Sequence, residues 1–286
     1  MRTLSRSGLL LLPVIAACSG VPEPVPATPP APPAAPEATA PPPPSAAPSA
    51  APHAHAPGHT HWSYVGEGSP TTWGELSPEF ETCKVGKHQT PIDVPKGVAK
   101  DKDLPAIVAS YKPTPLALLN NGHTVQASAV GSSIALGKDT YELVQAHLHA
   151  PAEHTVEGKT FAAELHLVHK NAEGKLAVVG VLLKKGKDNK PLAPFFDHLP
   201  TEASIEPKPI GNAELDLSAL VPAKSAYATY EGSLTTPPCS EGVRWVLLTK
   251  PGEVSQAQLD KWKAVFAHAT NRPVQPIGDR KVRASK

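Results

Sequence analysis

The chain has 286 residues, with 27 lysines and arginines against 26 aspartates and glutamates, so its formal net charge is only +1. Nucleic-acid binding needs a concentrated basic surface, which this balance does not indicate, and we expect no nucleic-acid partner. Hydrophobic residues make up 40% of the chain, but 35 residues are proline. A packed core is therefore expected only where proline is sparse.

The N-terminus has the features of an export signal. Two arginines precede an apolar run over residues 8–17, which is too short to span a bilayer, and Cys18 follows. The run resembles a bacterial lipobox, which predicts that residues 1–17 are removed and that lipid on Cys18 holds the protein to a membrane. The serine after Cys18 favours the outer membrane of a Gram-negative bacterium, facing the periplasm or the cell surface. The alternative is an ordinary signal peptide with an incidental cysteine.

Residues 18–60 are rich in proline and alanine, a composition typical of an extended, disordered tether. The tether ends in His53, His55, His59 and His61. Histidine-rich tracts can bind metal, but we favour weak, incidental affinity here.

Residues 61–286 read as one mainly β domain, a single α+β domain around a large, mostly antiparallel sheet with a few short helices. Short strand-like runs separated by turn residues occur at 116–120, 124–129, 141–149, 161–169, 176–183 and 243–248. One helix is expected after Ser255 as N-cap, with Leu259, Trp262, Val265 and Phe266 on one face.

The strongest chemical signal is a set of three histidines on two of these strands. Strict alternation places Tyr141, Leu143, Gln145, His147 and His149 on one strand face. It likewise places Glu164, His166 and Val168 together on the other strand.

Paired side by side, the two strands can direct His147, His149 and His166 to one point. Three neutral imidazoles leave a tetrahedral zinc one open position, as in a catalytic site. Gln145 and Glu164 each lie two residues before a ligand, where they can hold its other ring nitrogen. The alternative is a set of surface histidines on a hydrated sheet.

His169 falls on the opposite face, and we interpret it as structural.

Several stretches between about residue 61 and 283 match one known family, in that family's order: 61–64, 89–93, 120–124, 145–149, 151–155, 163–169, 232–239, Trp245 and 272–276. Through these stretches the chain resembles the bacterial α-class carbonic anhydrases. The resemblance implies the α-carbonic anhydrase fold and one zinc ion on His147, His149 and His166. It also implies reversible hydration of CO2 to bicarbonate and a proton, by attack of zinc-bound hydroxide on CO2.

The resemblance also assigns roles around the zinc. Thr235 accepts the hydrogen bond of the hydroxide and donates its own to Glu153, and Thr236 neighbours bicarbonate. A main-chain carbonyl near Thr270 holds the middle ligand. His123 stands where the family keeps its proton shuttle, a task suited to an unperturbed pKa of about 6.5.

Two walls are expected to line the pocket. The apolar wall, which suits uncharged CO2, consists of Val168, Val178, Leu234, Val243 and Trp245; these could also be plain core residues. The polar wall, which orders water, consists of Tyr64, Asn121 and Gln126.

The residues flanking the first two ligands, Ala146, Leu148 and Ala150, are smaller than in relatives, and the smaller side chains could loosen the support beneath the ligands.

With Cys18 lipidated, Cys83 and Cys239 remain as an even pair in an exported domain, and both match a disulfide of the bacterial members.

Two other functions compete with catalysis: a non-catalytic carbonic-anhydrase-like binding module, and a metal-capture lipoprotein using the histidine-rich tract. The resemblance leaves a homodimer open.

Overall fold

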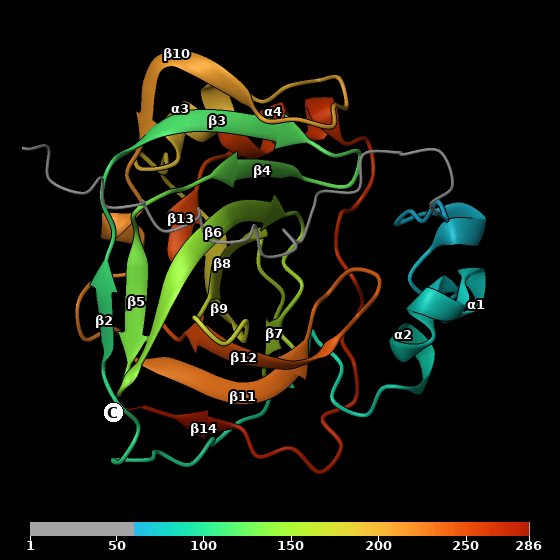
Figure 1. Ribbon diagram of the computed structural model, residues 1–286, viewed down its shortest axis with the longest axis vertical. Helices are drawn as coiled ribbons and strands as arrows, with labels where there is room; N and C mark the ends of the chain where they lie inside the picture. The colour runs from blue at the N-terminus through green and yellow to red at the C-terminus, as the bar shows by residue number, and fades with distance from the viewer. Residues whose placement is uncertain (1–59, 286) are drawn as a thin grey trace, which may run out of the picture. The chain divides into compact units, whose positions relative to one another are not determined.

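The computed structural model describes residues 60–285, and one large β-sheet dominates them. Within these residues, twelve strands form the sheet, whose main path runs β10-β3-β4-β6-β8-β9-β12-β11-β14 (Figure 1). Most neighbours are antiparallel, but β9 pairs in parallel with β12 and β13. The short strands β1 and β7 form a separate parallel pair. The predicted fold class is therefore confirmed.

The strands are β1 (Asp93–Val94), β2 (Ile107–Ser110), β3 (Thr114–Asn120), β4 (Val125–Ser128), β5 (Ser133–Leu136), β6 (Asp139–His149), β7 (Thr155–Val156), β8 (Ala163–Lys170), β9 (Leu176–Lys185), β10 (Lys208–Leu215), β11 (Tyr227–Ser233), β12 (Glu241–Leu248), β13 (Gly252–Val254) and β14 (Arg283–Ala284). The helices are α1 (Trp73–Leu76), α2 (Thr82–Val85), α3 (Ala193–Asp197) and α4 (Gln256–Val265), with 3-10 turns at Gly66–Gly68, Pro78–Phe80 and Ser218–Leu220.

All six strand-like runs named from the sequence overlap strands, namely β3, β4, β6, β8, β9 and β12. The sequence reading did not name the other strands, of which β10 and β11 are the longest. Strand β11 is buried on both faces for most of its length, so its sequence does not alternate. Strand β10 carries Pro209 and Gly211 at the edge of the sheet, where its register with β3 shifts.

The predicted helix is α4, and its N-terminal cap is as expected. The Ser255 hydroxyl accepts the Gln258 amide while the Gln258 side chain accepts the Ser255 amide, which forms a reciprocal capping box. Leu259 and Trp262 are buried, Phe266 closes the helix, and Val265 is half-buried. The apolar face predicted for this helix is confirmed.

One prediction about β6 is wrong. Tyr141 and Leu143 lie on the face opposite Gln145, His147 and His149, because the register with β8 shifts between Leu143 and Gln145. The extra residue is a β-bulge, which breaks the two-residue alternation and exchanges the faces. Only the segment after the bulge carries the ligand pattern.

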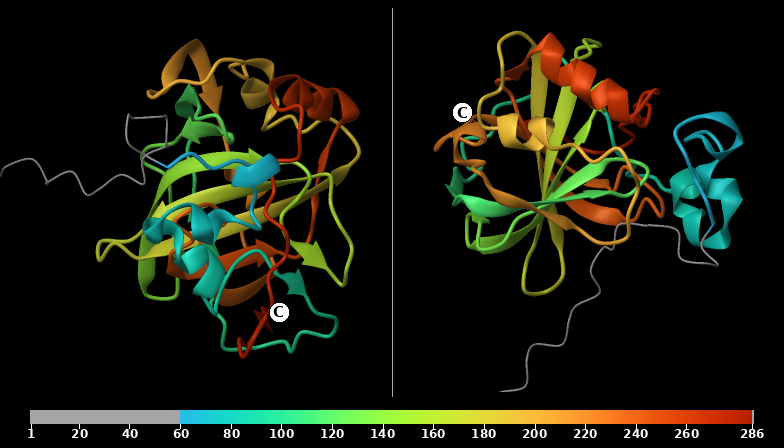
Figure 2. Two further views of the ribbon diagram at one scale, coloured as in Figure 1. Left: turned by 90° about the vertical axis from the view of Figure 1, so that its right-hand side faces the viewer. Right: turned by 90° about the horizontal axis from the view of Figure 1, so that it is seen from above.

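The sheet separates two hydrophobic clusters. The larger, which we call the main core, includes Ala146, Leu148, Leu165 and Leu167 together with residues of α3 and α4. The smaller, which we call the site-face cluster, includes Val168, Val178, Val243 and Trp245. Figure 2 shows α4, in orange-red, on a different side of the sheet from α1 and α2, in cyan.

The predicted signal peptide, Cys18, the tether and the histidines at 53, 55 and 59 lie outside the described residues. In the part of the chain that the structure describes, no helix has the length and apolar character needed to cross a membrane.

Candidate active site

Strands β6 and β8 bring the three predicted histidines together. His147 lies directly opposite His166 in the antiparallel register, and His149 lies opposite Glu164. One ring nitrogen from each of His147, His149 and His166 lies within 4.8 Å of the others. The predicted juxtaposition of the three imidazoles is present.

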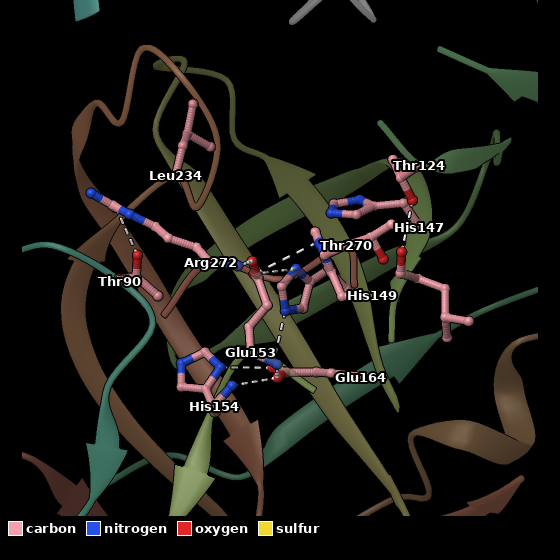
Figure 3. A network of polar contacts seen from close by, with 12 residues as sticks. Thr90, Thr124, His147, His149, Glu153, His154, Glu164, Leu234, Thr270 and Arg272 are labelled. Atoms are coloured by element: carbon pink, nitrogen blue, oxygen red, sulfur yellow. Dashed lines mark hydrogen bonds and ion pairs between the residues drawn. The ribbon is translucent and has the colours of Figure 1, made fainter. Parts of the chain in front are cut away.

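Each histidine uses its other ring nitrogen in a hydrogen bond that orients the ring. His147 Nδ1 lies 2.8 Å from Gln145 Oε1, and His166 Nε2 lies 3.0 Å from Glu164 Oε1. His149 Nδ1 lies 2.5 Å from the main-chain oxygen of Thr270 (Figure 3). These contacts leave Nε2 of His147, Nε2 of His149 and Nδ1 of His166 to face one another.

The donor set fits a metal ion. His149 Nε2 is fully buried and has no hydrogen-bond partner among the described residues, which is costly unless another group binds it. Burial lowers the pKa of His149 to about 4 and holds the pKa values of His147 and His166 below their usual range. The imidazoles are therefore neutral near pH 7 and can donate lone pairs.

Glu164 is the centre of a buried hydrogen-bond network that sequence reasoning did not assign in full. Besides His166, its carboxylate bonds His154 Nδ1 at 2.7 Å and accepts the amides of Glu153 and His154 (Figure 3). His154 Nε2 in turn lies 2.6 Å from the Tyr230 hydroxyl. Burial alone raises the pKa of Glu164, but His154 and His166 together lower it well below its usual range.

His154, Glu164 and His166 also place ligand atoms within 4.8 Å of one another. Their facing atoms already bond to each other, so this second cluster is a positioning network for His166 rather than a second metal site. Gly180 lies opposite His166 on β9 and leaves space for this network. A Cβ at that position would lie 3.0 Å from Glu164 Oε1 and 2.7 Å from the Leu247 side chain. His154 lies within a matching stretch, but nothing in its spacing marks it as a partner of Glu164.

Glu153 lies beside the ligands and is fully buried. Its Oε1 accepts the Arg272 backbone amide at 2.8 Å, and its Oε2 lies 3.6 Å from His149 Nε2. Burial raises the pKa of Glu153 to about 7, against the opposing effects of His166, the Arg272 amide and the neighbouring Thr235 side chain. The structure thus brings Thr235 and Glu153 together.

The loop that carries Thr235 joins β11 to β12 and is tied covalently to the N-terminal helices. A disulfide links Cys83 to Cys239, as predicted, and the Cys239 amide donates to the Thr236 oxygen at 2.9 Å. The buried Arg272 side chain donates to the Cys83 oxygen at 3.1 Å. Arg272 therefore connects the disulfide region with Glu153, a link that the sequence did not reveal.

The residues of the predicted apolar wall gather on the ligand side of the sheet. Val168, Val178 and Trp245 lie side by side across β8, β9 and β12, and the Trp245 ring centroid is 4.9 Å from that of His166. The whole set lies in or against the site-face cluster: Val168, Val178, Leu234, Val243 and Trp245.

The three residues of the predicted polar wall do not all have the same kind of contact with the metal centre. Gln126 lies opposite His147 on β4. The buried Tyr64 ring centroid lies 6.5 Å from that of His149. Asn121 uses its side-chain oxygen to accept the amides of His123 and Thr124, so it holds the turn that presents His123.

His123 is largely buried and stacks on Trp62, with ring centroids 3.6 Å apart and planes inclined by 9°.

His169 lies on the opposite sheet face, buried, with Nε2 3.0 Å from the Tyr111 hydroxyl. The structural interpretation of His169 agrees with this placement.

A three-histidine centre on the face of a large mixed sheet defines this chain as a metalloenzyme of the carbonic anhydrase type. The family model for eukaryotic-type carbonic anhydrase matches residues 68–286. A carbonic anhydrase of Klebsiella pneumoniae is 42% identical over 226 residues, covering 78% of this chain and 90% of the relative. A carbonic anhydrase of a Nostoc species is 43% identical over 228 residues, covering 78% and 85%.

Among solved structures, the α-carbonic anhydrase of Thermovibrio ammonificans, in complex with the inhibitor sulfanilamide, is 40% identical with a TM-score of 0.74. The match covers 79% of this chain and all of that one. The chain belongs to the eukaryotic-type, or α-class, carbonic anhydrase family. It has carbonic anhydrase activity, the reversible hydration of CO2 to bicarbonate and a proton.

Proposed function

We propose that the metal of this carbonic anhydrase is a single zinc ion held by His147, His149 and His166. The observation that carries the proposal is the set of three converging ring nitrogens, each opposed by a hydrogen bond on the far side of its ring. Three neutral nitrogen ligands suit zinc and leave one coordination position open. When bound, zinc lowers the pKa of water and so supplies an oxygen nucleophile near neutral pH.

Thr235 and Glu153 orient the reacting groups. A carboxylate can only accept hydrogen bonds, so an ionised Glu153 makes Thr235 its donor. The Thr235 oxygen is then left as an acceptor toward the metal centre, which selects one orientation of the nucleophile. Glu153 Oε2 lies 3.6 Å from His149 Nε2 and 3.9 Å from His166 Nδ1. A cation bound by these imidazoles would favour the ionised form of Glu153, and the Arg272 amide favours it further.

The apolar wall receives CO2, and Thr236, next to Thr235 in the loop, receives bicarbonate. Because CO2 is uncharged, it can bind to an apolar surface without having to displace strongly bound water. Gln126 and Tyr64 face the same centre from the other side, where they order water. Burial raises the pKa of Tyr64 well above its usual value, so its hydroxyl stays protonated.

His123 carries the proton away from the site. The turn held by Asn121 and the stacking on Trp62 fix the orientation of its imidazole. The Thr124 hydroxyl ties the same turn to the main-chain oxygen of Leu148, next to the ligand His149. An imidazole exchanges protons readily near neutral pH, which suits this task.

The rest of the chain fits an exported enzyme. We infer that residues 1–17 are a signal peptide, residues 18–60 a tether lipidated at Cys18, and residues 61–286 the catalytic domain, at the outer membrane of a Gram-negative bacterium. The disulfide supports export, because disulfides persist in oxidising compartments. Beneath the ligands, Ala146 and Leu148 pack in the main core and Ala150 packs against it.

Metal analysis of the full chain tests the zinc assignment. One zinc per chain is expected, with CO2 hydration lost on chelation and restored by one equivalent of zinc. Several weakly held zinc ions per chain would favour the metal-capture alternative. Full activity in protein free of metal would refute the mechanism.

A further inference from the structure

A second concave region lies outside the metal centre. It has a volume of about 770 Å³ and contains none of the three proposed metal ligands, although Tyr230, which bonds His154, is part of its lining. We call it the basic cavity. It draws residues from β11, β12 and β14, which are neighbouring strands in Figure 1, and its lining includes Lys175, Tyr230, Arg244, Arg280, Lys281 and Arg283.

Five of the lining side chains are cationic and two are carboxylates. Two of the cations have acidic neighbours. Arg283 lies 3.1 Å from Asp101, and Arg244 lies 3.9 Å from Asp139 and opposite Glu231 in the strand register. Their charge is therefore largely balanced within the fold.

The other three cations, Lys175, Arg280 and Lys281, have no carboxylate within ion-pair distance in residues 60–285. The nearby Asp279 carboxylate instead lies 3.1 Å from His88 Nε2. The lining side chains of the cavity therefore carry more cations than carboxylates, in a chain whose overall charge is nearly zero.

The direct contacts that hold Arg280 in place are with neutral groups, while the Glu241 and Asp279 carboxylates act on it from beyond ion-pair distance. Its guanidinium donates to the backbone oxygens of Ile277 at 2.8 Å and Pro276 at 2.6 Å, and it lies 5.5 Å from the centroid of the Tyr230 ring. Backbone carbonyls and an aromatic ring fix the orientation of a cation without cancelling its charge. Such a preorganised guanidinium loses little entropy when an anion binds.

We propose that the basic cavity binds a soluble anion carrying two or more phosphate groups, with Arg280, Lys175 and Lys281 as its charged contacts. Its volume falls in the usual range of small-ligand sites and is far larger than a bicarbonate ion needs. Three separate unpaired cations match a ligand with several negative charges. A guanidinium and two ammonium groups are the side chains that recognise phosphate.

Isothermal titration of the zinc-loaded full chain with inorganic phosphate, pyrophosphate and tripolyphosphate tests this proposal. Saturable binding of one ion per chain is expected, with affinity rising along that series and falling as salt is added. The double variant Lys175→Glu with Lys281→Glu is expected to bind tripolyphosphate at least about tenfold more weakly. CO2 hydration, measured without the anion, is expected to stay unchanged in this variant.

The matched control is Lys190→Glu with Lys208→Glu, which makes the same change in net charge at exposed lysines outside the cavity. This control is expected to bind like the wild type, and heat from chelation of zinc by polyphosphate is common to both variants. No saturable binding at millimolar concentration would overturn the proposal. Equal weakening in the two double variants would overturn it as well, because it would show only general electrostatic attraction.

Discussion

The two faces of the central sheet use the same strands for opposite purposes. On β6 and β8, Ala146, Leu148, Leu165 and Leu167 pack into the main core and are at most 2% exposed. The intervening side chains on the other face form the metal centre and its hydrogen bonds. Each ligand is thus flanked along the strand by residues whose burial fixes the backbone.

This difference explains how the site can be polar, buried and still well ordered. Burying apolar side chains stabilises the fold by about 25 cal/mol per Å², whereas burying an imidazole without a partner costs free energy. Apolar packing on the main-core face stabilises the strands. That stabilisation offsets the cost of burying the histidines and carboxylates close together on the site face. Four predictions test this division, from the largest expected effect to the smallest.

The first compares two buried histidines on opposite faces. His149→Ala removes a ligand nitrogen and is expected to abolish both tight zinc binding and CO2 hydration, because two imidazoles cannot complete the site. His169→Gln, on the main-core side, is expected to keep one zinc per chain and most of the activity. Zinc analysis and stopped-flow hydration measure both. Retained activity in His149→Ala would contradict the ligand assignment.

The second prediction concerns removal of the disulfide between Cys83 and Cys239, the covalent restraint on the Thr235 loop. The disulfide closes a loop with a sequence separation of 156 residues, for which the chain-entropy model gives at most about 5 kcal/mol of stabilisation. The variant with Cys83→Ser and Cys239→Ser should lose stability up to that amount in urea unfolding. Near its melting temperature it should lose activity before zinc, since the Thr235 loop loosens first.

Ser240→Ala, an exposed change in the same loop, serves as the control and should leave stability within about 0.5 kcal/mol of the wild type. If the double serine variant is as stable as this control, the disulfide does not restrain the fold.

The third prediction concerns the pH dependence of folding stability that His169, on the main-core side, produces. Burial lowers the pKa of His169 to about 4, whereas an unfolded histidine titrates near 6.5. Between these values the unfolded chain binds a proton that the folded chain excludes, so this group makes stability fall as the pH falls from 6.5 to 4. The contribution is about 3 kcal/mol over that window.

Urea unfolding of His169→Gln at pH 7 and pH 4 should therefore show a smaller loss of stability than the wild type shows. An identical pH dependence in the two proteins would mean that His169 is not buried in its neutral form.

The fourth, and smallest, concerns proton export. His123→Ala is expected to lower kcat by about 100-fold while leaving kcat/KM for CO2 nearly unchanged, because attack on CO2 precedes the affected step. Imidazole buffer should restore much of the loss, and the exposed His198→Ala should show no effect. An equal fall in kcat and kcat/KM without rescue would show that His123 is not the shuttle.

The sequence by itself determined much of this protein. Alternation placed His147 and His149 on one face and Glu164 and His166 on another, because side-chain direction in a strand follows from local backbone geometry. The capping box at Ser255 is equally local. The resemblance to the family, carried by several stretches, correctly implied the partners of the ligands and the disulfide.

Other features depended on contacts between distant segments. The bulge between Leu143 and Gln145 exists only relative to β8, so alternation alone assigned Tyr141 and Leu143 to the wrong face. The bond from Arg272 to Glu153 joins residues 119 positions apart.

The basic cavity likewise combines β11, β12 and β14 with the loop before β14. Its cations are scattered along a chain of nearly zero net charge, and composition cannot show where the tertiary fold gathers them. Local geometry is encoded within a few residues, whereas proximity across the fold is set by how the whole sheet packs.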